Sequence, residues 1–130
     1  VQWKKRFQLY NNNKMFARYS SFSIESESSN YSKVEGTITE QLLSVGDSLS
    51  NHNGQKFSTF DNDQDSSGGW SCARQFLGGF WYNDCHKTNP NAVCRWGADG
   101  TIYAVGVSWH QWKDHDYSLK TISMKIRPVE

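Results

Sequence analysis

The sequence lacks any apolar run of the length that a transmembrane helix requires, so it gives no sign of membrane insertion. It also lacks a strong charge of either sign, because its 130 residues carry a formal net charge of +1 and a pI near 7.9. Nucleic-acid-binding domains typically carry clustered basic residues, so no nucleic-acid partner is expected. No secretory signal is recognisable at the start, which leaves either a mature fragment or a cytosolic chain.

Cysteines are few and odd in number, at three. Cys72 and Cys85 are close enough in sequence to close a small loop, which would stabilise the fold by about 3 kcal/mol if oxidised. Cys94 is then left as a free thiol or an intermolecular partner. A zinc site built from these cysteines and His86 is the alternative, but it lacks the closely spaced ligand pairs of familiar zinc sites. Disulfides indicate an oxidising compartment, and the sequon Asn30-Tyr31-Ser32 agrees with secretion.

The length allows one domain with a modest core, and an aromatic content of 15% argues against disorder. Alternating patterns predict antiparallel strands over residues 1–10, 14–24, 31–38 and 117–128. Between residues 57 and 109 the Gly, Asn and Asp spacing leaves little room for regular structure. A long irregular segment inside a compact domain usually carries a functional site.

Three aspartates alternate at Asp61, Asp63 and Asp65, and a Ser/Gly run follows them. Carboxylates this close repel one another, and Ca²⁺ relieves that repulsion by taking oxygen ligands from flexible loops. An EF-hand loop is excluded, because Ser66 and Cys72 stand where that motif requires Gly and Glu. A solvated acidic turn remains the alternative, since these residue types also favour turns.

The sequence resembles the fibrinogen-like domain over nearly its whole length, with motifs in family order and near-family spacing. The motifs that carry the resemblance are Gly46-Asp47-Ser48-Leu49, Phe57-Ser58-Thr59, Asp61 to Asp65, Cys72-Ala73, Gly79-Phe80-Trp81-Tyr82, Cys85-His86, Asn89-Pro90-Asn91, Gly106-Val107-Ser108-Trp109, Trp112-Lys113, Tyr117 to Lys120 and Met124 to Pro128. The resemblance implies an α+β fold with an antiparallel sheet and a loop-rich subdomain that binds calcium and ligand. It implies a sheet subdomain from residues 1–50 and 117–130, and a ligand-binding subdomain from residues 51–116.

The N-terminal third of the family's domain has no counterpart in this sequence. Either the family fold is shortened here, or the sequence is a fragment of a longer one. Missing strands would leave a sheet edge open to pairing, which would favour a homo-oligomer.

Within the family, the pocket pattern is most similar to the acetyl-recognising ficolin and tachylectin-type lectins. Carried over position by position, the resemblance implies a disulfide between Cys72 and Cys85 and a cis peptide bond at Asp84-Cys85. It also implies a small pocket for an acetyl group, formed by Phe76, Cys85, His86, Tyr103, Ala104 and His115. Two positions depart from the pattern, because Phe76 replaces a common Tyr and His115 replaces a usual aromatic residue.

The resemblance also implies a calcium site that supports the pocket without touching the sugar. Its ligands would be the carboxylates of Asp63 and Asp65 and the carbonyls of Ser67 and Gly69, with Asp61 just outside. The loop from Asp65 to Cys72 is one residue longer than in similar sequences, and this affects the two carbonyl positions most.

These features predict a secreted, extracellular, calcium-supported lectin for N-acetylated sugars of the N-acetylglucosamine or N-acetylgalactosamine type, acting in innate immune recognition and agglutination. The alternative is a protein–protein interaction module, as in fibrinogen, angiopoietins and tenascins. Phe76 and Tyr103-Ala104 favour the lectin, because fibrinogen's peptide pocket has acidic residues there to hold an amine. An enzyme is not expected, since a disulfide-bonded Cys85 cannot act as a thiolate beside His86 and no Ser/His/Asp signature appears.

Overall fold

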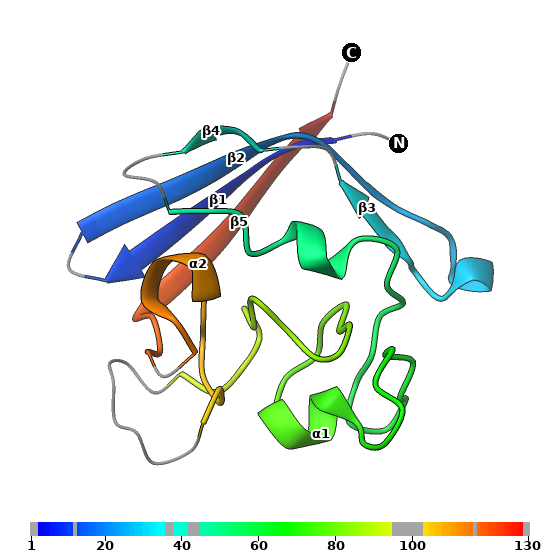
Figure 1. Cartoon of the computed structure of the whole chain (residues 1–130). Helices are drawn as coiled ribbons and strands as arrows, with labels where there is room; N and C mark the ends of the chain where they lie inside the picture. The colour runs from blue at the N-terminus through cyan, green and yellow to red at the C-terminus, as the bar shows by residue number, and fades with distance from the viewer. Residues whose placement is uncertain are drawn as a thin grey trace.

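The computed structural model of the protein describes residues 3–11, 13–35, 38–41, 45–94, 103–115 and 117–128. An antiparallel sheet lies on one side of the molecule and a loop-rich half with two short helices lies against it (Figure 1). The strands are β1 (Trp3–Asn11), β2 (Asn13–Ile24), β3 (Lys33–Glu35), β4 (Ile38–Gln41) and β5 (Thr121–Pro128). The helices are η1 (Glu27–Ser29), η2 (Ser50–His52), α1 (Cys72–Phe76) and α2 (His110–Lys113). None of the described helices is long and apolar enough to cross a membrane.

The sheet has the strand order β3-β2-β1-β5, and β4 also pairs with β2. β1 and β2 form a hairpin that closes at the Asn11–Asn13 pair. β5 runs antiparallel to β1, from the Tyr10–Thr121 pair to the Trp3–Pro128 pair, so the two ends of the described sequence lie at the same end of the sheet (Figure 1). The antiparallel arrangement is as predicted.

Two strand predictions need correction in their bounds. Of the strand predicted over residues 31–38, the structure assigns residues 33–35 to β3 and residue 38 to the start of β4, and these two strands pair with different parts of the long β2. The closing strand begins at Thr121 and not at residue 117. Ser118 and Leu119 are buried and bond to Val107 in the loop-rich half. The Leu119 amide donates to the Val107 carbonyl at 2.7 Å, and Ser118 Oγ accepts from the Val107 amide at 3.1 Å.

The core lies between β2 and the loop-rich half. Met15, Ala17 and Tyr19 alternate along β2 and are at most 7% exposed, as expected for one buried face of a strand. They pack in one cluster with Trp81 and Trp109 from the loops. Trp112 packs against this cluster in a partly buried position. All three tryptophans therefore serve the core.

The Gly46-Asp47-Ser48-Leu49 turn joins the sheet to α2. Asp47 Oδ1 accepts hydrogen bonds from the Tyr19 hydroxyl at 2.9 Å, the Leu49 amide at 3.0 Å and the Ser50 amide at 3.1 Å. Burial alone would raise the pKa of Asp47, but hydrogen bonding from the Ser50 side chain, together with these three hydrogen bonds, outweighs it and lowers the pKa.

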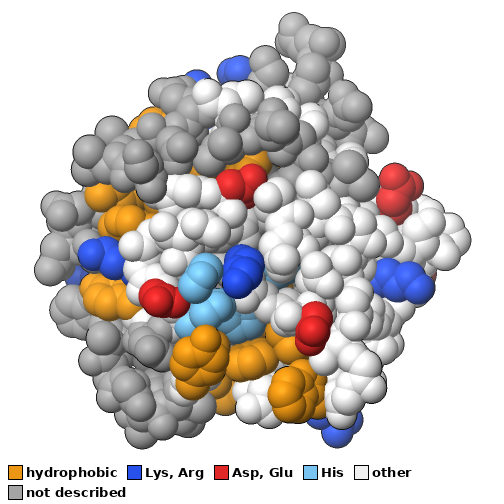
Figure 2. All heavy atoms as spheres, in the orientation of Figure 1, with side chains coloured by type: hydrophobic (Ala, Val, Ile, Leu, Met, Phe, Trp, Pro, Cys, Tyr) orange, Lys and Arg blue, Asp and Glu red, His pale blue; other side chains and the backbone are white. Residues whose placement is uncertain are grey.

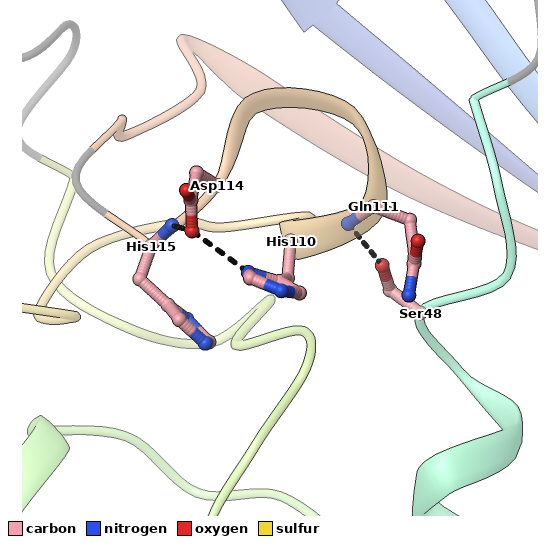
Figure 3. A network of polar contacts seen from close by, with 5 residues as sticks. All are labelled: Ser48, His110, Gln111, Asp114 and His115. Atoms are coloured by element: carbon pink, nitrogen blue, oxygen red, sulfur yellow. Dashed lines mark hydrogen bonds and ion pairs between the residues drawn. The ribbon is translucent and has the colours of Figure 1, made fainter.

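Glycine is required at position 46, because its φ is +74° and an added Cβ would lie 2.5 Å from Gln111 Cβ. Ser48 Oγ accepts from the Gln111 amide at 2.9 Å, and this bond fixes the start of α2 (Figure 3). The turn thus positions the helix that borders the candidate site.

Candidate ligand pocket and acidic loop

A disulfide between Cys72 and Cys85 fixes one side of the candidate pocket, as the resemblance implied. Their Cα atoms are 5.4 Å apart, and the peptide bond Asp84-Cys85 is cis. Cys72 begins α1, whose N-cap is Ser71, with its hydroxyl oxygen accepting from the Arg74 amide at 3.4 Å. The disulfide therefore ties this short helix to the segment that enters the pocket.

The structure brings all six predicted pocket residues together around one cavity of about 250 Å³. These are Phe76, Cys85, His86, Tyr103, Ala104 and His115. Four further residues line the same cavity: Asn51, Trp70 and Lys87, which were not predicted, and Asp84, which was expected as a negative charge at the pocket rim. Figure 2 shows histidine side chains gathered in the middle of this face, bordered by hydrophobic side chains.

The rings around this cavity meet mostly edge to face. Phe76 and His86 have centroids 4.8 Å apart with planes at 90°, and His86 and His115 are 5.3 Å apart at 80°. Tyr103 contacts His115 at 5.7 Å. Such contacts orient each ring against its neighbour, so the cavity has aromatic and imidazole walls in fixed positions.

His86 is the buried polar group of the pocket, at 6% exposure. Its Nε2 lies 3.1 Å from the Ala104 carbonyl, which can only accept, so Nε2 carries the proton. Ala104 reaches this position with a φ of +58°. His86 Nδ1 is then an acceptor, and it is buried without a hydrogen-bond partner among the described residues.

Burial, and then the neighbouring His115, lower the pKa of His86 to about 3. Its imidazole is therefore neutral at physiological pH, and His86 brings no positive charge to the pocket lining.

His52 is a structural residue of the site that sequence reasoning missed. It is fully buried, its Nδ1 donates to the Trp81 carbonyl at 2.7 Å, and its Nε2 accepts from the Lys87 amide at 3.1 Å and the Thr88 amide at 3.4 Å. These partners require the neutral ring with the proton on Nδ1. Because the Lys87 and Thr88 amides directly follow His86, His52 fixes the backbone on which that pocket residue sits.

A second buried network holds the C-terminal end of α1. The Tyr82 hydroxyl donates to Asn89 Oδ1 at 2.6 Å, and Asn89 Nδ2 donates to the Phe76 carbonyl at 3.0 Å. Burial raises the pKa of Tyr82, so its hydroxyl stays protonated as a donor. Gly78 leaves room for this network, because an added Cβ would lie 2.5 Å from the Tyr82 hydroxyl oxygen. The network positions the pocket wall at Phe76.

The predicted calcium ligands lie on a loop that is organised around Asp65. Asp65 Oδ1 accepts from the Ser67 amide at 2.9 Å and Oδ2 accepts from the Cys72 amide at 2.8 Å. Asp63 Oδ1 accepts from the Asp65 amide at 3.3 Å. The loop is therefore bonded to the first residue of α1 and, through the disulfide, to the pocket.

Burial, and then the neighbouring Asp63 carboxylate, raise the pKa of Asp65 against its backbone hydrogen bonds. A divalent cation between two such carboxylates removes their repulsion, so the donor set fits Ca²⁺. Asp61 is engaged elsewhere, since the Thr59 hydroxyl donates to its Oδ1 at 2.6 Å. This agrees with a place for Asp61 outside the ligand set.

A larger and shallower hollow of about 650 Å³ lies on the other side of α1, around Phe60, Arg74 and Leu77. Its size exceeds that of the histidine-lined cavity, but its described lining contains no buried polar side-chain atom that lacks a hydrogen-bond partner. We therefore place the candidate site in the smaller cavity, where His86 Nδ1 is such an atom.

Comparison with known proteins gives a family for nearly the whole sequence. The profile of the fibrinogen beta and gamma chains, C-terminal globular domain, matches residues 2–129. This family is non-enzymatic, in agreement with the prediction of no catalytic activity.

Curated relatives cover most of this protein but only part of their own length. Techylectin-5A of Tachypleus tridentatus is 39% identical over 127 residues, which are 96% of this sequence and 42% of that protein. Fibrinogen C domain-containing protein 1 of Macaca fascicularis is 40% identical over 92% of this sequence and 28% of that protein. Tenascin of Mus musculus is 40% identical over 87% of this sequence and 5% of that protein. The sequence thus spans less than half the length of these relatives.

Solved structures match the fold closely. The fibrinogen-like globe domain of human ANGPTL2 superimposes with a TM-score of 0.90 at 38% identity, over 98% of this protein and 58% of that domain's structure. Lamprey fibrin D-dimer, complexed with the peptide Gly-His-Arg-Pro-amide, superimposes with a TM-score of 0.86 at 26% identity, over 99% of this protein and 47% of the fibrin polypeptide. The arrangement of sheet and loops is therefore a fibrinogen-like globe fold.

Proposed function

The protein belongs to the family of C-terminal globular domains of the fibrinogen beta and gamma chains, and from that membership we propose that it is a calcium-supported lectin for N-acetylated sugars. The ligand class is glycans bearing N-acetylglucosamine or N-acetylgalactosamine. In this proposal residues 51–116 form the ligand-binding subdomain, and residues 1–50 with 117–130 form the sheet subdomain.

The observation that carries the proposal is the meeting of Phe76, His86, Tyr103, Ala104 and His115 around one small cavity. An acetamido group needs an apolar cup for its methyl and a few placed polar partners for its amide. Phe76 and the small Ala104 side chain supply apolar surface. His86 Nδ1, buried and without a partner among the described residues, supplies an acceptor for the amide N–H.

Calcium is proposed as a support for this cup. Asp63 and Asp65 would hold the ion through their carboxylates, with the carbonyls of Ser67 and Gly69 completing the set. A bound Ca²⁺ supplies charge compensation for the two aspartates. The Asp65 bond to the Cys72 amide then connects the loop to the disulfide and to the pocket wall.

The disulfide supports a secreted, extracellular location, because disulfides persist in oxidising compartments. We place the protein in innate immune recognition and agglutination, as a homo-oligomer, because weak single-site sugar binding becomes useful when sites are linked. The name of techylectin-5A, a lectin at 39% identity, supports the same placement.

The test is retention on N-acetylglucosamine beads in calcium, followed by elution with free acetylated competitor or with EDTA. A Tyr103→Ala variant removes an exposed pocket wall, and Phe60→Ala removes a similarly exposed aromatic ring from the other hollow as a matched control. We expect Tyr103→Ala to lose retention and Phe60→Ala to keep it. Equal retention of both variants would contradict a sugar site in this cavity.

A protein-interaction module is the second candidate. It is supported by tenascin at 40% identity and by the superposition on a fibrin structure complexed with a peptide. If the folded, calcium-loaded protein is not retained on acetylated beads, and binds Gly-His-Arg-Pro-amide instead, this candidate replaces the lectin.

A further inference from the structure

A cluster of three potential metal ligands lies at the edge of the pocket, on a different segment from the acidic loop. His110, Asp114 and His115 each offer one ligand atom, and these atoms lie within 4.8 Å of one another. Within the part of the sequence that the structure describes, this is the single such group of His, Cys, Asp and Glu side chains. Figure 3 shows the Asp114 carboxylate directed at the His110 ring and at the His115 backbone amide, with the His115 ring on the far side of that amide.

The local backbone produces this grouping. α2 is a single turn, and it ends at Asp114, whose φ of +61° reverses the backbone. His115 therefore comes back beneath His110, and the two imidazoles stack with centroids 4.2 Å apart and planes at 23°. Asp114 Oδ1 lies 2.9 Å from His110 Nδ1 and accepts from the His115 amide at 2.8 Å. The carboxylate is thus held beside both rings.

The geometry is close to that of a metal site. Ligand atoms around a tetrahedral zinc ion at bond lengths of about 2.1 Å lie about 3.4 Å apart. His110 Nδ1 and Asp114 Oδ1 are 2.9 Å apart and no pair of ligand atoms is more than 4.8 Å apart. Side-chain rotations that move atoms by on the order of 1 Å therefore close the site. The His110 and Asp114 side chains are 28% and 75% exposed, which leaves them free to make such a movement.

The types of ligand atom in this cluster indicate which class of metal ion it would bind. Imidazole nitrogens suit zinc, copper and nickel, whereas Ca²⁺ takes oxygen ligands alone. Two histidines with one carboxylate form a ligand set that leaves a fourth position open in zinc sites. We propose that His110, Asp114 and His115 bind a divalent transition-metal ion, such as Zn²⁺, at the rim of the pocket, separately from the calcium loop.

The site adjoins the pocket because His115 belongs to both. Its ring contacts His86 at 5.3 Å and Tyr103 at 5.7 Å. An ion that holds His115 against His110 fixes one wall of the cavity, so the ion and a pocket ligand affect each other's affinity by the same factor.

Zinc titration by calorimetry tests the site directly. The protein is tag-free, saturated with Ca²⁺ to occupy the acidic loop, and carries Cys94→Ser so that the exposed thiol cannot bind zinc. We expect one zinc ion per protein molecule. His110→Gln, Asp114→Asn and His115→Gln should each weaken binding by at least about tenfold, because even residues that only orient metal ligands contribute that much.

Gln111→Ala is the matched control, since Gln111 lies on the same helical turn and holds Ser48 through its backbone amide alone. It should bind zinc as the parent does. Thermal unfolding of each variant verifies that it is folded. Absence of zinc binding, or undiminished affinity in His110→Gln and His115→Gln, overturns the proposal.

Copper gives an independent signature. In the electron paramagnetic resonance spectrum of the Cu²⁺-loaded protein, we expect coupling to two imidazole nitrogens, reduced to one in either histidine variant. A spectrum with oxygen ligands alone overturns the assignment. Neither readout uses a sugar, so failure of the lectin proposal leaves the metal test intact.

Discussion

Replacing His52 tests whether a buried imidazole supports the pocket from below. His52→Ala removes the partner of the Trp81 carbonyl and of the Lys87 and Thr88 amides, which lie 2.7, 3.1 and 3.4 Å from its ring nitrogens. The substitution also removes an edge contact with Phe80, at a centroid distance of 5.0 Å.

The loss in free energy of unfolding depends on which of these backbone partners can bond to water once the imidazole is removed. A buried polar group left without a hydrogen bond costs about 1–3 kcal/mol. The Thr88 residue is fully buried, and the lost ring leaves a cavity. Lys87 is partly exposed and can bond to solvent, so its amide contributes less. We expect a loss of about 4 kcal/mol, a large part of the roughly 5–15 kcal/mol that holds a domain together.

His52→Gln keeps an acceptor near the Lys87 amide and should cost less, about 1–2 kcal/mol. Lys56→Ala, an exposed substitution nearby, should change stability by no more than about 0.5 kcal/mol. Urea unfolding measures all three. If His52→Ala fails to fold, the glutamine variant still reports the effect.

The ring's role in the pocket has a second readout. Amide hydrogen exchange at Thr88 should be slow in the parent and faster in His52→Gln, and acetylated-sugar affinity should fall by about tenfold, or about 1.4 kcal/mol. A structural role for His52 is refuted if the free energy of unfolding of His52→Ala lies within about 1 kcal/mol of the parent value and the Thr88 amide stays protected from exchange.

The disulfide, the acidic loop and His86 each give one further prediction. Replacing Cys72 and Cys85 together by serine should lower the free energy of unfolding by about 3 kcal/mol, since the bridge closes a loop with a sequence separation of 13; an unchanged urea midpoint would contradict this. Asp63→Asn with Asp65→Asn should abolish the rise in melting temperature on adding Ca²⁺, and a variant that still responds would exclude these ligands. Burial lowers the pKa of His86 from 6.5 to about 3, so the unfolded protein binds a proton that the folded protein does not, and stability should fall as pH falls through this window. The slope of the free energy of unfolding against pH should reach about 1.4 kcal/mol per pH unit, and it should be smaller in His86→Phe. An identical slope in that variant would assign the loss of stability to other titrating groups.

Residues that are defined by short motifs could be predicted from the sequence. The Cys72–Cys85 pairing and the meeting of Phe76, Tyr103 and His115 followed from family motifs whose order and spacing are preserved.

Long-range backbone contacts could not be predicted in the same way. His52 precedes Asn53-Gly54, a sequence that indicates a turn, and its function depends on the Lys87 amide 35 residues later. No local pattern encodes that contact. Trp70 lies between Gly69 and Ser71 in a run typical of turns, and only the fold brings its exposed ring to the pocket.

The strand boundaries were predicted wrongly for a related reason. Alternation of buried and exposed positions reports burial on one side, and it does not say which element covers that side. Leu119 has a strand-like position in the pattern, but its amide bonds to Val107 in the loop-rich half. Ser118 and Leu119 are both buried, so the alternation in the sequence over residues 117–120 does not mark one buried face of a strand.

The charges that line the cavity distinguish the lectin from the peptide-binding module better than the shape of the cavity does. A pocket for an N-terminal amine needs a carboxylate near its base, because a buried ammonium without a partner is costly. The described lining contains one carboxylate, Asp84, which is exposed at the rim, and Lys87 lies in the same lining with the opposite charge. The same lining carries Phe76 and the neutral, buried His86. A neutral acetamido group therefore enters this pocket with less desolvation cost than an amine does, and this difference favours the lectin over the peptide-binding module.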